Sequence, residues 1–228
     1  MILLAIYNIV LSKYSGQDDI VVGSGTSGRM HPDVESLAGM FVNTLMMRNQ
    51  PNGYKTFKEF LNELRENTLK AFDNQSYPFE KLVEDLALDR KIGRRPLHDT
   101  VFMLQNMDDT EIYIDGLKVT YREPDLKIAE ADLLLYAYEK NNDINLKFVY
   151  CTALYKKETI DKLAKYYLRT AEQVSINEDI VIRDIKILDD NERENLLSGI
   201  DNKSMEIVFD FDLDFDEDIS KGCVKQHE

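Results

Sequence analysis

Residues 39–45 read Gly39-Met40-Phe41-Val42-Asn43-Thr44-Leu45, and this stretch constrains the fold more than any other in the chain. Its apolar members fit a buried strand. Asn43 and Thr44 bring an amide and a hydroxyl into that strand, and buried polar groups of this kind need hydrogen-bond partners. We therefore expect them either to bond neighbouring backbone or to face a polar cavity, and the sequence leaves both open.

Three further patterns surround this stretch in a fixed order. They are Lys13-Tyr14-Ser15-Gly16-Gln17-Asp18-Asp19-Ile20-Val21-Val22-Gly23 leading to Gly28-Arg29, then Asn74-Gln75-Ser76-Tyr77-Pro78-Phe79-Glu80, and the segment from Arg90 to Leu97. A glycine-rich turn at Gly28 lets main chain approach a ligand or another strand closely. Pro78 and Glu80 favour a helix start, because proline suits the first turn and a carboxylate suits the positive end of the helix dipole.

Hydrophobic periods along the chain predict interleaved helices and strands. Helices are predicted at residues 2–14, 56–73, 78–88 and 156–174, and a short one is capped by Asp190 and ends at Gly199. Strands are predicted at 19–23, 100–105, 111–121, 132–139, 145–151 and 180–188, with a hairpin turn at 141–143. Strands mixed with long helices indicate an α/β (α+β) protein, built as a mixed-sheet α/β sandwich.

Composition excludes several classes of function. An apolar fraction of 43% is enough for a packed core, and a net charge of −14 argues against a nucleic-acid binder. The two cysteines, Cys151 and Cys223, form no disulfide framework, so a cytoplasmic location fits. Met1–Leu11 is apolar but too short to span a bilayer and lacks signal-peptide features, so we expect no membrane partner and a core helix there.

The sequence contains none of the usual motifs for cofactors or metals. Nucleophile elbows, Walker loops, dinucleotide fingerprints and zinc spacings are all missing. The acidic stretch from Asp210 resembles a calcium loop only in part, since Phe215 and Lys221 stand where glycine and glutamate are required. We therefore predict no metal and no directly bound cofactor, and we interpret residues 201–228 as an acidic tail or the start of a linker.

Taken in order, the four patterns resemble the later motifs of the condensation domains of nonribosomal peptide synthetases. The resemblance covers about residues 1–200 and implies a chloramphenicol-acetyltransferase-like subdomain, specifically the C-terminal, acceptor-side half of a condensation domain. The His-His-x-x-x-Asp-Gly motif of that family occurs nowhere in the sequence. His31, His98 and His227 lie outside any such motif, and His31 is expected to be a surface or loop residue.

The resemblance implies a function and partners. Condensation domains form an amide bond between aminoacyl or peptidyl thioesters held on the 4'-phosphopantetheine arms of peptidyl carrier proteins. The missing N-terminal half would be a second partner, and the chain alone is expected to be inactive. The alternatives are a non-catalytic remnant that only binds carrier proteins, or half of an epimerisation or cyclisation domain.

The resemblance also implies roles for particular residues, none of them catalytic. Gly28, Arg29, Asn43 and Thr44 are candidates for the substrate tunnel, although Arg29 could instead pair with a carboxylate inside the fold. Residues of the later motifs are expected to be structural: Tyr77, Pro78, Phe79, Arg90 and Arg94.

Some positions depart from the family pattern, and one segment carries a separate prediction. Asn74 replaces the usual histidine, and Lys91 and Arg95 replace the usual Asp and Asn. The segment between Asp108 and Asp132 would cross to the other half in a complete domain. Alone, it is expected to be extended, poorly packed and a site of self-association.

Overall fold

A computed structural model describes residues 1–87, 95–105, 115–117, 129, 131–140, 143–201 and 226–227. The chain divides into two compact units. Unit 1 comprises Met1–Val21, Met47–Asn74 and Glu158–Lys221, and unit 2 comprises Val22–Met46, Gln75–Lys157 and Gly222–Glu228. The boundary between them passes through the first two strands of the chain.

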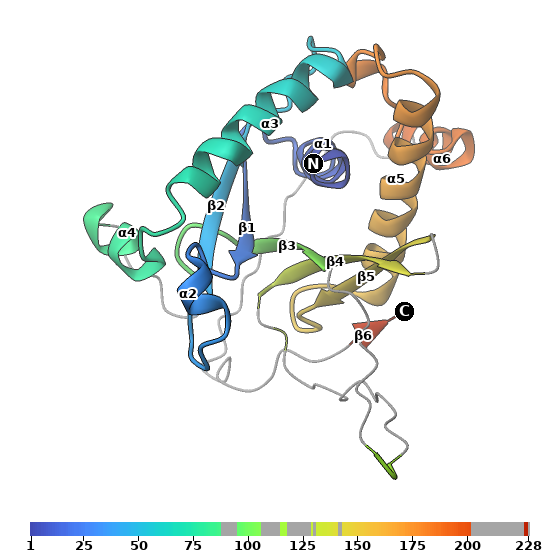
Figure 1. Cartoon of the computed structure of the whole chain (residues 1–228). Coiled ribbons are helices and arrows are strands. Elements are labelled where there is room, and N and C mark those ends of the chain that lie inside the picture. The colour runs from blue at the N-terminus through green and yellow to red at the C-terminus, as the bar shows by residue number, and fades with distance from the viewer. Residues whose placement is uncertain are drawn as a thin grey trace. The chain divides into compact units, whose positions relative to one another are not determined.

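Unit 1 is built mainly from three helices: α1 (Ile2–Ser15), α3 (Phe57–Asp73) and α5 (Lys157–Ile176) (Figure 1). Every residue of α1 from Leu4 to Val10 is buried, as a core helix requires, and Gly16 ends it in the left-handed conformation. A capping box between Thr56 and Glu59 starts α3. The Tyr167 hydroxyl of α5 donates to the Leu3 carbonyl at 2.9 Å and so joins α5 to α1. The helices predicted for these three segments are confirmed.

Unit 2 holds most of a six-stranded mixed sheet with the strand order β2-β1-β3-β4-β5-β6. The strands are β1 (Ile20–Thr26), β2 (Asn43–Asn49), β3 (Thr100–Gln105), β4 (Leu133–Lys140), β5 (Asp143–Tyr150) and β6 (Gln226–His227). β1 pairs with β3 and β3 with β4 in parallel, whereas β4–β5 and β5–β6 are antiparallel. The predicted hairpin and mixed sheet are therefore confirmed.

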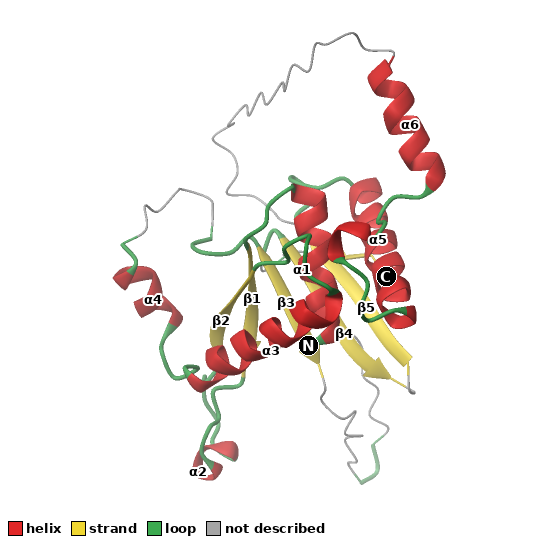
Figure 2. Ribbon diagram, turned by 90° about the horizontal axis from the view of Figure 1, so that it is seen from above, coloured by secondary structure: helices red, strands yellow, loops and turns green. Residues whose placement is uncertain are grey.

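The central strand of this sheet shows why its sequence is almost wholly apolar. Leu133, Leu134, Leu135 and Ala137 of β4 are all buried, as in a strand covered on both faces. β4 lies between β3 and β5 in Figure 2, and a cluster around Val101 and Leu134 packs on one face. The first strand of the hairpin thus supplies much of the core of unit 2.

The prediction of a strand at residues 180–188 is wrong. Only Val181 forms a β-bridge, with Thr56, and a 3-10 turn follows at Ile182–Asp184. The N–H groups of Ile182 and Arg183 donate to the carbonyls of Lys55 and Gly53. Because these main-chain groups already have partners, no strand ladder forms, and the apolar spacing instead suits a tight turn.

The apolar run Met40-Phe41-Val42 is also not a buried strand. β2 begins only at Asn43, and Met40 and Val42 are 86% and 58% exposed. Phe41 packs its ring against the Arg29 guanidinium, which lies 4.4 Å from the ring centroid. Residues 39–42 thus lie in a loop that contacts Arg29. A short helix, α2 (Pro32–Glu35), lies upstream of this loop and was not predicted.

Two helix boundaries also differ from the prediction. α4 (Phe79–Asp85) stops before residue 88, and Ala87 follows it with a positive φ. α6 (Asp190–Asp201) starts at Asp190, but the capping side chain is that of Asp189, whose Oδ1 accepts from the Glu192 N–H at 2.6 Å. Gly199 does not end α6, which continues to Asp201.

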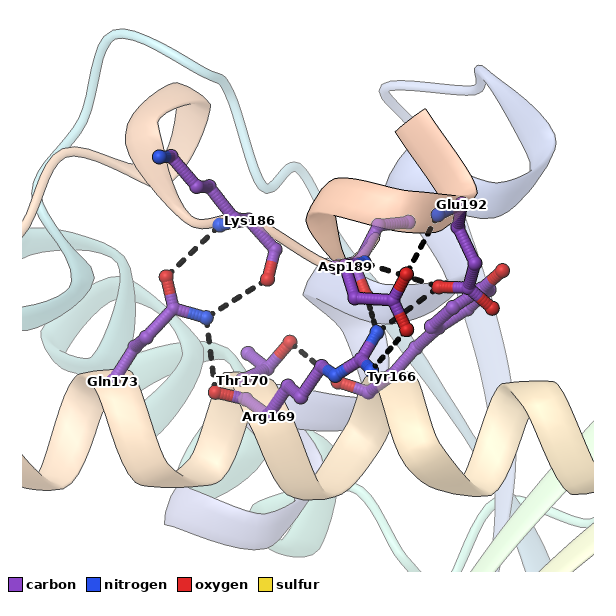
Figure 3. Close-up of polar contacts among 8 residues, drawn as sticks. Tyr166, Arg169, Thr170, Gln173, Lys186, Asp189 and Glu192 are labelled. Carbon is purple, nitrogen blue, oxygen red and sulfur yellow. Dashed lines mark hydrogen bonds and ion pairs between the residues drawn. The ribbon is translucent and has the colours of Figure 1, made fainter. Parts of the chain in front are cut away.

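A polar cluster in unit 1 fixes the segment that leads into α6 (Figure 3). Arg169 of α5 donates to the Ile187 carbonyl at 3.1 Å and to the carboxylates of Asp189 and Glu192 at 2.8 and 3.0 Å. One turn further along α5, Gln173 both donates to and accepts from the Lys186 main chain, each at 2.9 Å. We call this set of residues the charged node.

Other predictions fall largely outside the described residues. The extended strand at 111–121 is described only at residues 115–117, and Arg90 and Arg94 are not described. Of the predicted acidic tail, the structure describes Asp201 and the short strand β6.

Candidate functional site

The candidate residues lie in unit 2, in the loop after β1 and at the start of β2. Gly28 has a φ of 65°, and a Cβ placed there would stand 1.9 Å from the Phe41 carbonyl oxygen. Only glycine fits such a position. The close approach expected at Gly28 therefore exists, and the group approached is the main chain of the 39–45 stretch.

Among the residues that the structure describes, Arg29 is held by main-chain carbonyls and not by a carboxylate. Its Nη1 donates to the Val34 carbonyl and, at 3.4 Å, to that of Glu35, while Nη2 lies 3.4 Å from the Gly39 carbonyl. The Phe41 ring covers the guanidinium, which adds a cation–π contact. Arg29 thus ties together both ends of the loop that contains α2.

Asn43 uses all of its hydrogen-bonding groups on backbone. Its Nδ2 donates to the carbonyls of Gln75 and Tyr77 at 2.9 and 2.7 Å. Its Oδ1 accepts from the N–H groups of Phe79 and Thr44 at 3.1 and 2.9 Å. A side-chain amide has two N–H donors and two lone pairs, so no capacity is left for a ligand. Of the two alternatives left open by the sequence, the structure shows the backbone-bonding one.

The contact with Phe79 also explains how α4 begins. Pro78 occupies the N-cap position and has no side-chain acceptor for the first N–H groups of the helix. The Asn43 Oδ1 supplies that acceptor from the start of β2. Tyr77, the residue before the proline, donates its hydroxyl to Asp85 on the same helix. The contacts of the Tyr77-Pro78-Phe79 motif thus involve both the first and the last residue of this helix.

Thr44 differs from Asn43 in what its side chain leaves free. Its main-chain N–H already donates to the Asn43 Oδ1. Within the described part of the chain its half-buried hydroxyl makes no hydrogen bond. Thr44 is therefore the member of the candidate set whose polar side chain remains available.

Sequence reasoning gave no role to His98, which is buried beside this site. Its ring occupies the space where a Gly23 Cβ would stand, 2.6 Å from the His98 Cδ2, and meets the Phe79 ring edge-on at 5.7 Å. Its buried Nδ1 has no hydrogen-bond partner among the described residues. Burial, aided by the Arg95 charge, lowers the pKa of His98 below its ordinary value. The imidazole is thus a neutral packing group.

His31 lies at the surface of unit 2, at the start of α2. The side chain of His31 is 70% exposed, and its Nδ1 accepts from the Asp33 N–H at the start of α2. It is thus a loop histidine at the surface. No cluster of three or more potential metal ligands occurs within the described ranges. Nor do those ranges contain a helix with the length and apolarity needed to cross a bilayer.

Thr26 and Gln75 also belong to this site, although the sequence did not single them out. The Thr26 hydroxyl, at the end of β1, lies 2.6 Å from the Gln75 Oε1, and the Gln75 carbonyl accepts from Asn43. Gln75 stands within a quoted motif, but nothing in its local pattern identifies a partner 49 residues away. We call Thr26, Asn43, Gln75 and the Phe79 N–H the neutral node.

Comparison with known proteins assigns most of the chain to one family. The Condensation domain family matches residues 1–197. Tyrocidine synthase 2 of Brevibacillus parabrevis is 49% identical over 197 residues, which are 86% of this chain and 6% of that protein. This chain therefore spans a small part of the length of the curated relatives that it matches.

Solved structures agree on the fold. A structure of the X-domain and OxyB complex from teicoplanin biosynthesis superposes with a TM-score of 0.75 at 25% identity, covering 83% of this chain and 42% of that one. The starter condensation domain of the rhizomide synthetase RzmA gives a TM-score of 0.62 at 18% identity and covers 82% of this chain and 44% of that one. The chain therefore belongs to the condensation domain family and has the chloramphenicol-acetyltransferase-like α/β fold expected from its motifs.

Proposed function

We propose that this chain supplies the acceptor-side half of a nonribosomal peptide synthetase condensation domain. The observation that carries the proposal is the coverage of the structural matches. More than four-fifths of this chain superposes on 42% and 44% of the X-domain complex chain and the starter condensation domain chain. Residues 1–197, which match the family, contain the four motifs and lack the His-His-x-x-x-Asp-Gly sequence.

The reaction proposed is amide formation between two carrier-bound thioesters. The amine of the acceptor aminoacyl group attacks the donor thioester carbonyl, a C–N bond forms, and the C–S bond breaks. The amine loses a proton, and the donor phosphopantetheine leaves as a thiol. Both phosphopantetheine arms belong to peptidyl carrier proteins, so they enter as substrate tethers and not as cofactors of this chain.

The contribution of this chain is positioning. Holding two tethered reactants in a fixed geometry replaces a bimolecular encounter and lowers the barrier. Asn43 is saturated by its backbone contacts, and the Arg29 guanidinium is bound to three main-chain carbonyls. Both are therefore proposed to shape the tunnel wall rather than to bind substrate. The Thr44 hydroxyl, which has no hydrogen-bond partner among the described residues, is the group proposed to contact the acceptor arm.

The test of this function is reconstitution. The purified chain is mixed with loaded donor and acceptor carrier proteins, with and without a separately produced N-terminal half that carries His-His-x-x-x-Asp-Gly. We expect no amide product above buffer from the chain alone, and product when the other half is present. Turnover by the chain alone would overturn the proposal, as would an absence of both product and carrier binding in the reconstituted mixture.

The proposed partners and location have tests of their own. The segment around 111–121, which would pair with the other half, is proposed to make the isolated chain self-associate; light scattering that shows a strict monomer would contradict this. Cys151 is a buried free thiol, which suits a reducing compartment. A cytoplasmic location is proposed on that ground and is checked by cell fractionation.

A further inference from the structure

Gln75 is bonded from two sides by the two motifs of the candidate site. Its side-chain Oε1 lies 2.6 Å from the Thr26 Oγ1, two residues before Gly28. Its main-chain carbonyl accepts from the Asn43 Nδ2 at 2.9 Å. One residue thus connects the end of β1, the start of β2 and the turn before α4, all within unit 2.

The direction of the Thr26 bond follows from the acceptor. The Gln75 Oε1 is an amide oxygen and can only accept, so the Thr26 hydroxyl donates its proton to it. The same Oγ1 accepts from the Gly28 N–H, whose nitrogen lies 3.5 Å away. Thr26 is only 8% exposed, so loss of the acceptor on Gln75 would leave the proton of a buried hydroxyl without an acceptor.

We propose that Gln75 is a positioning residue that holds the Gly28-Arg29 loop in register with Asn43. Its side chain fixes the loop through Thr26, and its carbonyl fixes the Asn43 amide. Gln75 would keep the two motifs in one fixed geometry because it binds both. The expected effect of this geometry on carrier binding rests on the proposed function.

The two contacts of Gln75 can be separated by mutation, because the bond to Thr26 uses its side chain and the bond to Asn43 uses its main-chain carbonyl. Gln75→Leu removes the Oε1 acceptor and leaves the carbonyl that receives Asn43. Thr26→Val removes the donor to Gln75 and also the acceptor of the Gly28 N–H. Gln75→Glu keeps an acceptor oxygen at the same place. Ser76→Ala changes the exposed neighbouring residue and is the matched control.

Hydrogen exchange of the full chain tests the positioning role directly. We expect residues 27–42 to exchange about five- to tenfold faster in Gln75→Leu and in Thr26→Val, as for loss of one buried hydrogen bond. The double variant should exchange no faster than Thr26→Val alone, because both substitutions remove the same bond. Gln75→Glu and Ser76→Ala should behave as wild type, and β4 should stay protected throughout.

The outcomes distinguish this inference from the proposed function. Wild-type exchange in Gln75→Leu, or failure of Gln75→Glu to restore protection, would overturn the positioning role. Faster exchange in β4 as well would overturn it too, because the effect would then be global. In parallel, binding of a carrier protein whose phosphopantetheine arm bears glycine should weaken by a similar factor in Gln75→Leu but not in Ser76→Ala. If wild type binds no carrier while the exchange results hold, the proposed function fails and the positioning role stands.

Discussion

The neutral node of unit 2 and the charged node of unit 1 solve the same problem with different chemistry. In each, side chains bind the main chain of a remote segment and so fix where a helix starts. Asn43 supplies an acceptor to the first N–H of α4, and the Asp189–Glu192 box caps α6 while Arg169 holds it to α5. Asn43 and Gln75 carry no charge, whereas Arg169 acts through two carboxylates.

This difference in charge predicts a difference in sensitivity. Side chains of the charged node keep appreciable exposure, 31% for Arg169 and 42% for Asp189, so salt screens their attraction. The neutral node depends on amide, hydroxyl and carbonyl groups, which neither salt nor moderate pH alters. Substitutions in the neutral node should therefore lower stability by a similar, large amount at low and high salt. Substitutions in the charged node should have a small effect that depends on salt.

The largest effect is expected from Gly28→Ala in the loop held by the neutral node. The new Cβ would stand 1.9 Å from the Phe41 carbonyl oxygen at a φ of 65°, so the main chain must move. We expect the free energy of unfolding to fall by about 3 kcal/mol or more. Denaturant titration measures it.

Gly16→Ala is the matched control for that substitution. Gly16 has a similar φ of 70°, but a Cβ there meets nothing within 4 Å. Only the left-handed conformation then costs energy, about 1 kcal/mol. Equal losses at Gly16 and Gly28 would show that the approach to Phe41 is not what requires glycine.

Asn43→Ala is expected to follow in size. It removes the four hydrogen bonds of the amide and leaves the Gln75 and Tyr77 carbonyls without their donor. The expected loss is about 2 kcal/mol, equal in low and high salt. Asn74→Ala, which removes one exposed bond to the Lys70 carbonyl, is the comparison and should cost less than about 0.5 kcal/mol. A salt-dependent loss in Asn43→Ala would contradict the assignment of this node as neutral.

These contacts also show how far the sequence can lead. Helical and strand periods predicted α1, α3, α5 and the β4–β5 hairpin, because each buries one continuous apolar pattern. The same reasoning failed at residues 180–188, where the apolar spacing is strand-like but the main chain bonds to Lys55 and Gly53. The hydrophobic period of a sequence indicates which side chains are buried. It does not indicate which backbone groups have hydrogen-bond partners elsewhere in the chain.

The sequence singled out several residues of the candidate site but did not predict which residues they bond to. Gly28, Arg29 and Asn43 stood out from their motifs, yet Asn43 bonds to residues 32 and 34 positions along the chain. His98 was missed because a lone histidine before a strand carries no pattern. Its burial depends on the space left by Gly23, and that pairing exists only in the folded chain.

His98 is not a member of the neutral node, but its ring packs against Phe79, and it should make the stability of the chain depend on pH. Burial lowers the pKa of folded His98 below its ordinary 6.5, so the unfolded chain takes up the proton first as the pH falls. Stability should then be fully present above about pH 6.5 and decline below it. Arg95 and Asp99 are the charged neighbours that act on the imidazole. Denaturant titrations between about pH 7 and pH 5 measure this slope.

Two variants test whether His98 is the source of the slope. His98→Phe keeps an aromatic ring against Phe79 and removes the titrating group, so the decline should become shallower. His31→Gln changes the exposed histidine and should leave the slope as it is. An unchanged slope in His98→Phe would assign the pH dependence to other groups.

The smallest effect is expected at the charged node. Arg169→Gln keeps a polar side chain but loses the charge that faces Asp189 and Glu192. The first turn of α6 should exchange its amide hydrogens roughly two- to fivefold faster at low salt, and this difference should disappear at high salt. The Glu192 N–H and Arg169 lower the pKa of Asp189 below its ordinary 3.8. Its contribution is therefore present above that pH and is lost as the pH falls below it.

Arg65→Gln on the exposed face of α3 is the control for this last variant and should change nothing in α6. The informative result is the salt dependence rather than the size. If the Arg169→Gln effect persists at high salt, the bond to the Ile187 carbonyl and not the carboxylates holds the segment. The two nodes would then be the same device, a side chain bound to main chain, and the contrast in charge would have no consequence for stability.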